Sequence, residues 1–164
     1  MDNNNGIDIN EIIENAKNDP DTLSSINITE ILENIDKKTI DVLDNKTIQS
    51  MNETNIDLFT NYNCSPDETY DLCNRLNGYR LVNEIFELHK GKNVKIFDTK
   101  TKKLKLGGIV YNITFSDNGP QVLCMNVSKR FFQYKFNNYI TFQRMSDEEH
   151  LILLVNEHIL NMDK

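Results

Sequence analysis

The sequence has little of several residue types that define common classes of protein. It contains no tryptophan and only six glycines, three prolines and three cysteines among 164 residues. Hydrophobic residues make up 38% of the chain, below the roughly 45–50% that is usual for globular domains. We therefore expect part of the chain to contribute little to a hydrophobic core.

Long apolar runs are also missing. The longest compact run, Leu151 to Val155, falls far short of the roughly 20 residues that span a bilayer. The first ten residues carry no positive charge and no apolar stretch, so we expect no secretory signal. Cys64, Cys73 and Cys124 are odd in number and lack metal-ligand spacing, which argues against a disulfide framework. These absences predict a protein outside the membrane, in the cytoplasm or the nucleus.

The residues used most freely, Asn, Ile, Lys and Asp, have AT-rich codons, whereas Ala, Gly, Pro and Trp are scarce. This bias indicates an AT-rich genome, such as that of a protist or a large DNA virus. For a viral protein, the expected location is the host cytoplasm or the virion.

Charge is divided sharply along the chain. Residues 1–90 hold 18 acidic and 7 basic side chains, a formal charge of −11, whereas residues 91–145 hold 2 acidic and 10 basic, a formal charge of +8. Residues 146–164 are acidic again, at −4. Such segregation predicts an electrostatic interaction within the chain or with a partner.

The first 64 residues are predicted to form an acidic arm, partly disordered or built from short helices. IDINEIIEN (7–15) and INITEILEN (26–34) repeat one pattern, with weaker copies in DVLDN (41–45) and DLFTN (57–61). Each copy has one apolar edge and ends near an Asn that suits a left-handed helix cap. The copies are either short helices that pack on the rest of the protein or short motifs that bind a partner.

A helix is predicted to begin at Ser65, because Ser65-Pro66-Asp67-Glu68 combines an N-cap, a proline at N1 and a capping-box glutamate. Asn77-Gly78 stops or kinks it, and the helical pattern resumes from Leu81 to Leu88. Cys73 lies on the apolar edge, where it suits a buried hydrophobic role better than a nucleophile.

After Gly91 the apolar period changes from 3.6 to 2, which indicates strands. A hairpin loop at 98–102, a bulge or bend at Gly107-Gly108, and turns at 116–120 and 137–138 separate about five short antiparallel strands. Ser146 to Glu149 is a capping box that opens a C-terminal helix. The predicted fold class is α+β: a small five-stranded antiparallel barrel or strongly bent sheet flanked by helices, spanning 65–164 with the C-terminal helix packed on it.

Residues 66–145 resemble the small β-barrels of the SH3-like and Sm-like kind. The resemblance rests on GKNVKIFD (91–98), LGGIVYNI (106–113) and VLCMNV (122–127), since the first strand of such barrels often follows Gly-Lys and the second begins near a glycine. The Asp and Asn with which Sm-like proteins hold a uridine have no counterpart in register here. The resemblance therefore implies a fold and no uridine site.

Basic residues interleaved with aromatics form the candidate binding surface. Nine of the fourteen aromatics lie in 91–145, and small barrels bind single strands by stacking bases on aromatics while Lys and Arg follow the phosphates. Phe97 or Phe131 would stack beside Tyr134. The candidate residues for nucleic acid or another partner are Lys95, Lys102, Lys103, Lys105, Lys129, Arg130, Phe131, Tyr134 and Lys135.

The same pattern also allows plainer readings. Half of the aromatics fill the core if the strands alternate, and the lysines then only solvate an exposed face. The basic surface is also open to the acidic arm of the same chain or of a neighbour. The function we predict is non-enzymatic protein–protein interaction, as a scaffold or structural protein that binds a protein partner or associates with itself through the arm. Single-stranded nucleic-acid binding, RNA included, is the alternative.

Enzymatic function is the weakest alternative, and a hydrolase is its only form we consider. His150 and His158 lie eight residues apart on one predicted helix, more than 10 Å along its axis at about 1.5 Å per residue, too far to share a metal by themselves. No phosphate-binding glycine loop, GxSxG, HExxH or CxxC motif occurs. We therefore expect no catalytic residue, no metal site and no cofactor.

Overall fold

The computed structural model describes residues 37–163. Contacts divide the chain into two compact units, Met1–Ser50 with Met145–Lys164, and Met51–Arg144. The predicted arm lies largely in residues 1–36, outside the described residues, so the arm and its boundary at residue 65 stay predictions. No helix in the described part is long and apolar enough to cross a bilayer.

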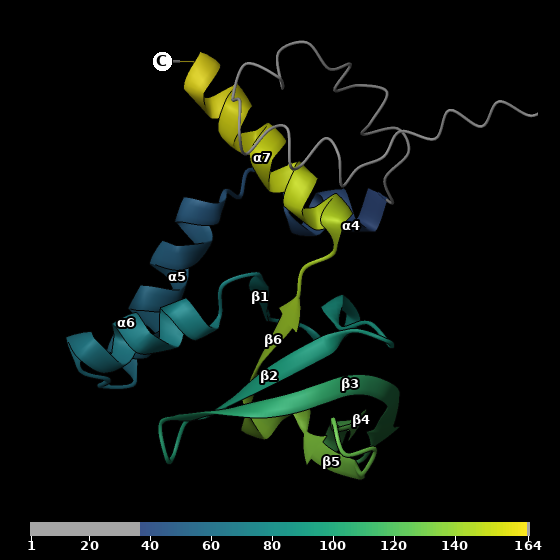
Figure 1. The fold of residues 1–164 in the computed structure, drawn as a ribbon. Coiled ribbons are helices and arrows are strands. Elements are labelled where there is room, and N and C mark those ends of the chain that lie inside the picture. The colour runs from purple at the N-terminus through teal and green to yellow at the C-terminus, as the bar shows by residue number, and fades with distance from the viewer. Residues whose placement is uncertain (1–36, 164) are drawn as a thin grey trace, which may run out of the picture. The chain divides into compact units, whose positions relative to one another are not determined.

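The second unit is α+β and contains one antiparallel sheet of six strands in the order β1–β6–β2–β3–β4–β5 (Figure 1). The strands are β1 (Tyr79–Val82), β2 (Asn93–Asp98), β3 (Lys103–Ser116), β4 (Gly119–Met125), β5 (Phe131–Lys135) and β6 (Ile140–Arg144). Because β1 and β5 do not pair with each other, the sheet is open. The predicted α+β class with an antiparallel sheet is confirmed. Of the two predicted forms, a barrel or a strongly bent sheet, the closed barrel is wrong, and the sheet has six strands where about five were predicted.

The additional strand is β1, in a segment predicted as helical. Leu81 lies opposite Phe142 and Val82 opposite Thr141 in β6, and half-buried and buried residues alternate along β1. A single 3-10 turn, η1 (Ile85–Glu87), follows. The spacing of Leu81, Val82 and Ile85 fits a helix. The segment forms a strand instead, because pairing with β6 and the burial of Val82 favour the extended conformation.

Each face of the sheet carries a hydrophobic core of its own. One face, here called the inner face, carries a core that includes Val94, Val110, Cys124 and Tyr134. The opposite face, here called the helix face, carries Phe97, Leu104 and Phe142, which pack against helices α5 (Ile48–Asn61) and α6 (Pro66–Arg75). These helices contribute Phe59, Leu72 and Leu76 to the shared core.

Local sequence explains the start of α6. The Ser65 hydroxyl accepts a hydrogen bond from Glu68 N at 3.2 Å, and Glu68 Oε2 accepts one from Ser65 N at 2.7 Å. Pro66 occupies the first helical position, where no N–H is needed. The predicted capping box is confirmed. Gly78, with φ of 84°, follows the end of the helix, as the Asn-Gly signal predicted.

The first unit contains α4 (Lys37–Val42) and α7 (Asp147–Met162). Asn45 follows α4 with φ of 57°, which is the left-handed cap predicted for the DVLDN copy. The Asn156 amide of α7 donates to the carbonyl oxygens of Leu43 at 2.9 Å and Lys46 at 2.8 Å. Ser146 caps α7 as predicted, accepting from Glu149 N at 3.2 Å.

A bend in β3 lets this strand pair with β2 along its first half and with β4 along its second. The register shifts at Val94–Lys95 opposite Gly107, which confirms the predicted glycine bulge. A Cβ on Gly107 would lie 2.6 Å from the Val94 carbonyl oxygen, and one on Gly108 would collide with the Met125 carbonyl. Gly108 also has φ of 133°. No other residue fits both positions.

We predict that Phe59→Ala destabilises the protein by about 3–5 kcal/mol. Phe59 is fully buried, with its ring centroid 5.0 Å from that of Phe97 and 6.1 Å from that of Phe142. Urea unfolding measures the change. Phe86→Ala is the control, because Phe86 is 71% exposed and its loss should change stability by about 0.5 kcal/mol or less. Equal effects of the two changes would show that α5 does not hold the sheet.

Candidate binding surface

Helices α5 and α6 bury only one half of the helix face, and the half formed by β3, β4 and β5 is exposed. Strand pairing sets Ile109, Met125 and Phe131 side by side across the three strands, with Leu123 in the next row. Leu106 lies opposite Lys95 on the same face. We call this surface the bare face; its apolar residues are Leu106, Ile109, Tyr111, Leu123, Met125 and Phe131.

Two aromatic rings form the centre of the bare face. The β3–β4 register shifts between Val110 and Asn112, and Tyr111 at this bulge packs against Phe131 with centroids 5.1 Å apart and ring planes at 75°. Tyr111 is 60% exposed and Phe131 54%. Edge-to-face packing at this distance is favourable, so the two rings form one apolar patch.

Cations line the edge of the patch. Lys129 and Arg130 lie in the turn between β4 and β5, and Lys135 lies on β5 opposite Gln121; all three are exposed. Lys103, another exposed lysine among the predicted residues, begins β3. The only carboxylates between residues 91 and 145 are Asp98 and Asp117, so the surface of β2–β5 is strongly positive.

Three of the predicted cations are engaged by the chain itself. Lys95 donates to the Arg75 carbonyl and lies 4.5 Å from the centroid of the Tyr79 ring. Its pKa is lowered by burial and by the nearby Arg75 charge. Lys102 donates to the Asn63 carbonyl at 3.1 Å. Their positive charges are therefore less available to a partner than the sequence predicts.

Lys105 is the third engaged cation and belongs to a turn network. Asp98 accepts hydrogen bonds from Lys100 N at 2.9 Å and Thr101 N at 3.3 Å through Oδ1, and its Oδ2 lies 3.2 Å from Lys105 Nζ. These hydrogen bonds hold the pKa of Asp98 below its ordinary value, the bond from Lys100 N most strongly. Asp98 therefore stabilises the predicted hairpin loop as a carboxylate.

The predicted stacking residues divide into one exposed and two buried rings. Phe131 is exposed, but Phe97 is 0% and Tyr134 7% exposed. The Tyr134 hydroxyl forms a 2.9 Å hydrogen bond with Thr141 Oγ1, and burial raises its pKa well above the ordinary value. Neither Tyr134 nor Phe97 offers an open ring face on the surface where Phe131 lies.

Apart from Phe131, sequence reasoning did not single out the apolar members of the bare face. Leu106 and Ile109 look like core residues, because apolar and polar residues alternate around them in β3. The alternation predicts one apolar face correctly. It carries no signal for where α5 and α6 stop covering that face, so the exposed half could be found only from the packing.

A cavity of about 360 Å³ lies between β2, β3, β5 and the start of β6, lined by Ile96, Lys105, Leu106, Asn126, Phe132, Gln133, Tyr134 and Tyr139. Lys105 Nζ is 5.8 Å from the Tyr139 ring centroid, and the Tyr134 and Tyr139 rings meet edge to face at 5.9 Å. The Lys105 ammonium in this lining is already paired with Asp98. The buried Tyr134 hydroxyl is already hydrogen-bonded to Thr141. The cavity therefore presents an apolar, aromatic wall.

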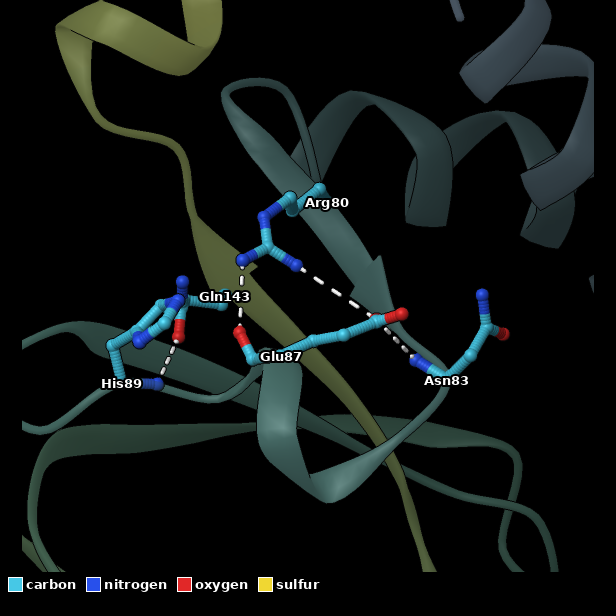
Figure 2. A network of polar contacts seen from close by, with 5 residues as sticks. All are labelled: Arg80, Asn83, Glu87, His89 and Gln143. Carbon is cyan, nitrogen blue, oxygen red and sulfur yellow. Dashed lines mark hydrogen bonds and ion pairs between the residues drawn. The ribbon is translucent and has the colours of Figure 1, made fainter. Parts of the chain in front are cut away.

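A buried polar network links β1, η1 and β6 (Figure 2). Arg80, which is 3% exposed, donates to the Glu87 carbonyl at 2.8 Å, and its guanidinium lies 3.9 Å from the Glu87 carboxylate. That carboxylate accepts from Asn83 N at 3.0 Å, and Gln143 Oε1 accepts from His89 N at 2.7 Å. Backbone groups are the main partners, so the network fixes the η1 loop.

None of the three cysteines has the lowered pKa of a reactive thiol. All three cysteines are free thiols, and burial raises each pKa, that of Cys124 to about 11. A thiol with a raised pKa is a poor nucleophile near neutral pH. Between residues 37 and 163, no three His, Cys, Asp or Glu side chains come together in a geometry that could hold a metal ion.

Comparison with known proteins gives no relative: no protein-family model, no curated protein and no solved structure matches the chain.

We predict that Asp98→Asn lowers the melting temperature at pH 7. Because the folded-state pKa of Asp98 is depressed, its stabilising effect is present above the pKa of the unfolded chain and is lost as pH falls through the folded value. The difference from the wild type should therefore persist at about pH 4 and vanish on further acidification. Asp117→Asn, in the β3–β4 turn, is the control. A difference independent of pH would contradict the role of the carboxylate.

Proposed function

We propose that this chain is a non-catalytic protein-interaction module that binds an acidic, apolar segment of a partner on its bare face. The observation that carries the proposal is the half-covered helix face. Where α5 and α6 lie over it, Phe97 and Phe142 are fully buried; beyond them Tyr111 and Phe131 are more than half exposed.

Exposed apolar surface of this kind is informative because it is contiguous. Single exposed hydrophobic residues are common on protein surfaces, but a patch across adjacent strands marks a place where another surface packs. Tyr111 and Phe131 support each other edge to face, and aromatic pairs are frequent at the centre of protein interfaces. The patch thus has the anchor residues that an interface needs.

Charge indicates the chemistry of the partner. Lys129, Arg130 and Lys135 lie around the patch, and Asp98, one of the two carboxylates in 91–145, is occupied by Lys105 and the turn amides. A partner with carboxylates around apolar residues would gain favourable long-range attraction and correct orientation. The sequence INITEILEN (26–34) has this chemistry, and a peptide of this sequence is a suitable probe.

Single-stranded nucleic acid is the second candidate, favoured by the position of exposed Phe131 next to Lys129 and Arg130. Three observations favour protein instead. Lys95, Lys102 and Lys105 are engaged within the chain. The other rings predicted to stack, Tyr134 and Phe97, are buried. The exposed neighbour, Tyr111, meets Phe131 edge to face rather than as a parallel platform.

We predict that the full-length chain binds a fluorescently labelled peptide of residues 26–34, and that Phe131→Ala and Tyr111→Ala each weaken binding about tenfold. The reason is loss of the apolar centre of the bare face. Fluorescence anisotropy measures the affinity. Phe86→Ala is the matched control, since Phe86 is an even more exposed aromatic residue, on η1.

A labelled oligothymidylate of about 12 nucleotides is measured in parallel at two salt concentrations. Tighter binding of the oligonucleotide than of the peptide, with a steep salt dependence that Lys129→Ala and Arg130→Ala flatten, would replace the protein proposal with nucleic-acid binding. Absence of binding to both probes, or equal binding by the Phe131→Ala variant, would refute the bare face as the site.

A further inference from the structure

We propose that the groove between α5 and α6 is a second interface, and that its occupant is the β4–β5 turn of a second copy of this chain. The inference concerns the groove and Val127, which are not part of the bare face, and it does not rest on the function proposed above; only the cations Lys129 and Arg130 are common to both proposals. It is carried by the match between an acidic apolar groove and a rigid basic turn that exposes an apolar residue.

The groove has a volume of about 440 Å³ and is lined by Ile56, Thr60, Cys64, Pro66, Thr69, Tyr70 and Cys73. It lies on the helices that bury Phe59 and Leu72 against the sheet, yet Ile56 is 46% and Tyr70 72% exposed. Both helices therefore present apolar side chains away from their own core. A surface of this kind is usually covered by another surface.

One residue of the groove lining, Thr69, has a buried hydroxyl without a hydrogen-bond partner in the described part of the chain. Thr69 is 6% exposed, and within the described part of the chain its Oγ1 has no hydrogen-bond partner. Buried hydroxyls are normally paired, and an exception calls for an explanation. An occupant that brings a backbone N–H or C=O into the groove would supply the partner.

Carboxylates are adjacent in sequence to the lining residues of this groove. Asp57, Asp67 and Asp71 each directly follow a lining residue in α5 or α6. Residues 51–75 together contain five carboxylates and one arginine, a formal charge of −4, and that arginine lies 3.8 Å from Asp71 in an ion pair. The occupant should therefore be basic as well as apolar.

The turn between β4 and β5 has this combination and is preorganised. Asn126 Oδ1 accepts from Ser128 N and Arg130 N, both at 3.0 Å, and Asn126 N donates to the Arg130 carbonyl at 2.9 Å. Lys129 has φ of 58° and donates its N–H to the Asn126 carbonyl at 3.0 Å. This network holds out Val127, which is 99% exposed, beside two cations.

The fit requires two copies. The core shared by α5 and α6 includes residues of β2, β3 and β6 but none of β4 or β5, and β5 is at the opposite edge of the sheet from β1. In a second copy, Val127 would enter the apolar groove, and Lys129 and Arg130 would meet the carboxylates. A rigid turn loses little entropy on docking, but the contact is small, so the association should be weak.

Sedimentation equilibrium on the full-length chain, from about 10 µM to about 1 mM, tests the inference. The average mass should rise with concentration, and Val127→Glu or Tyr70→Glu alone should abolish the rise, since each introduces a carboxylate into an acidic, apolar contact. Both positions are highly exposed, so folding should be preserved. Phe115→Glu, on an exposed aromatic of β3, is the matched control and should associate like the wild type.

Mixing the two variants gives the decisive result. Val127→Glu retains an intact groove and Tyr70→Glu an intact turn, so an equimolar mixture should form a two-copy species and nothing larger. A monomeric wild type, association that survives both changes, or a mixture that stays monomeric would each overturn the inference. Tyr111→Ala should associate normally while binding the peptide about tenfold more weakly, so failure here and failure of the bare-face proposal are distinguishable.

Discussion

The bend of β3 at Gly107 and Gly108 is the constraint on which the arrangement of the second unit depends. Without side chains at these two positions, the strand comes close to the Val94 and Met125 carbonyls. One strand can then serve two partners, β2 before the bend and β4 after it. The bend thereby separates the strands that α5 and α6 cover from the strands whose outer face is bare. The surface proposed to bind a partner exists because the sheet extends beyond its helices.

Formal charge and available charge differ in this protein. The β region is strongly basic in sequence, yet the chain uses part of that charge on itself: Lys95 and Lys102 satisfy backbone carbonyls of the α6 and α5 ends, and Lys105 pairs with Asp98. Hydrogen bonds from charged groups are stronger than neutral ones, so these lysines help to fix the helices and the hairpin. The cations left for a partner are concentrated around the bare face and the β4–β5 turn.

Local signals in the sequence predicted local structure well. The Ser65 capping box, the Asn45 cap and the Gly107-Gly108 bulge depend on a few neighbouring residues, and each is present. Features that depend on tertiary packing could not be predicted from the sequence in the same way. The segment around Leu81 fits a helix until β6 is there to pair with it. Tyr134 and Phe131 are three residues apart in one strand, and odd spacing already placed them on opposite faces; which face would be bare depended on how far the helices reach.

Helices α5 and α6 carry apolar residues both on the side that covers the sheet and on the side that lines the groove. A helix that only covers a sheet needs one apolar stripe, and Phe59 and Leu72 belong to that stripe. Ile56 and Tyr70 do not belong to that stripe. They line one groove together with Thr69, whose buried hydroxyl has no hydrogen-bond partner among residues 37–163. Val127 is likewise an exposed apolar side chain: it lies almost completely exposed in a turn that Asn126 fixes. Each feature is costly for an isolated chain, because exposed apolar area and unpaired buried hydroxyls both oppose folding. Their opposite charges make each the natural complement of the other, so one contact between copies removes both costs.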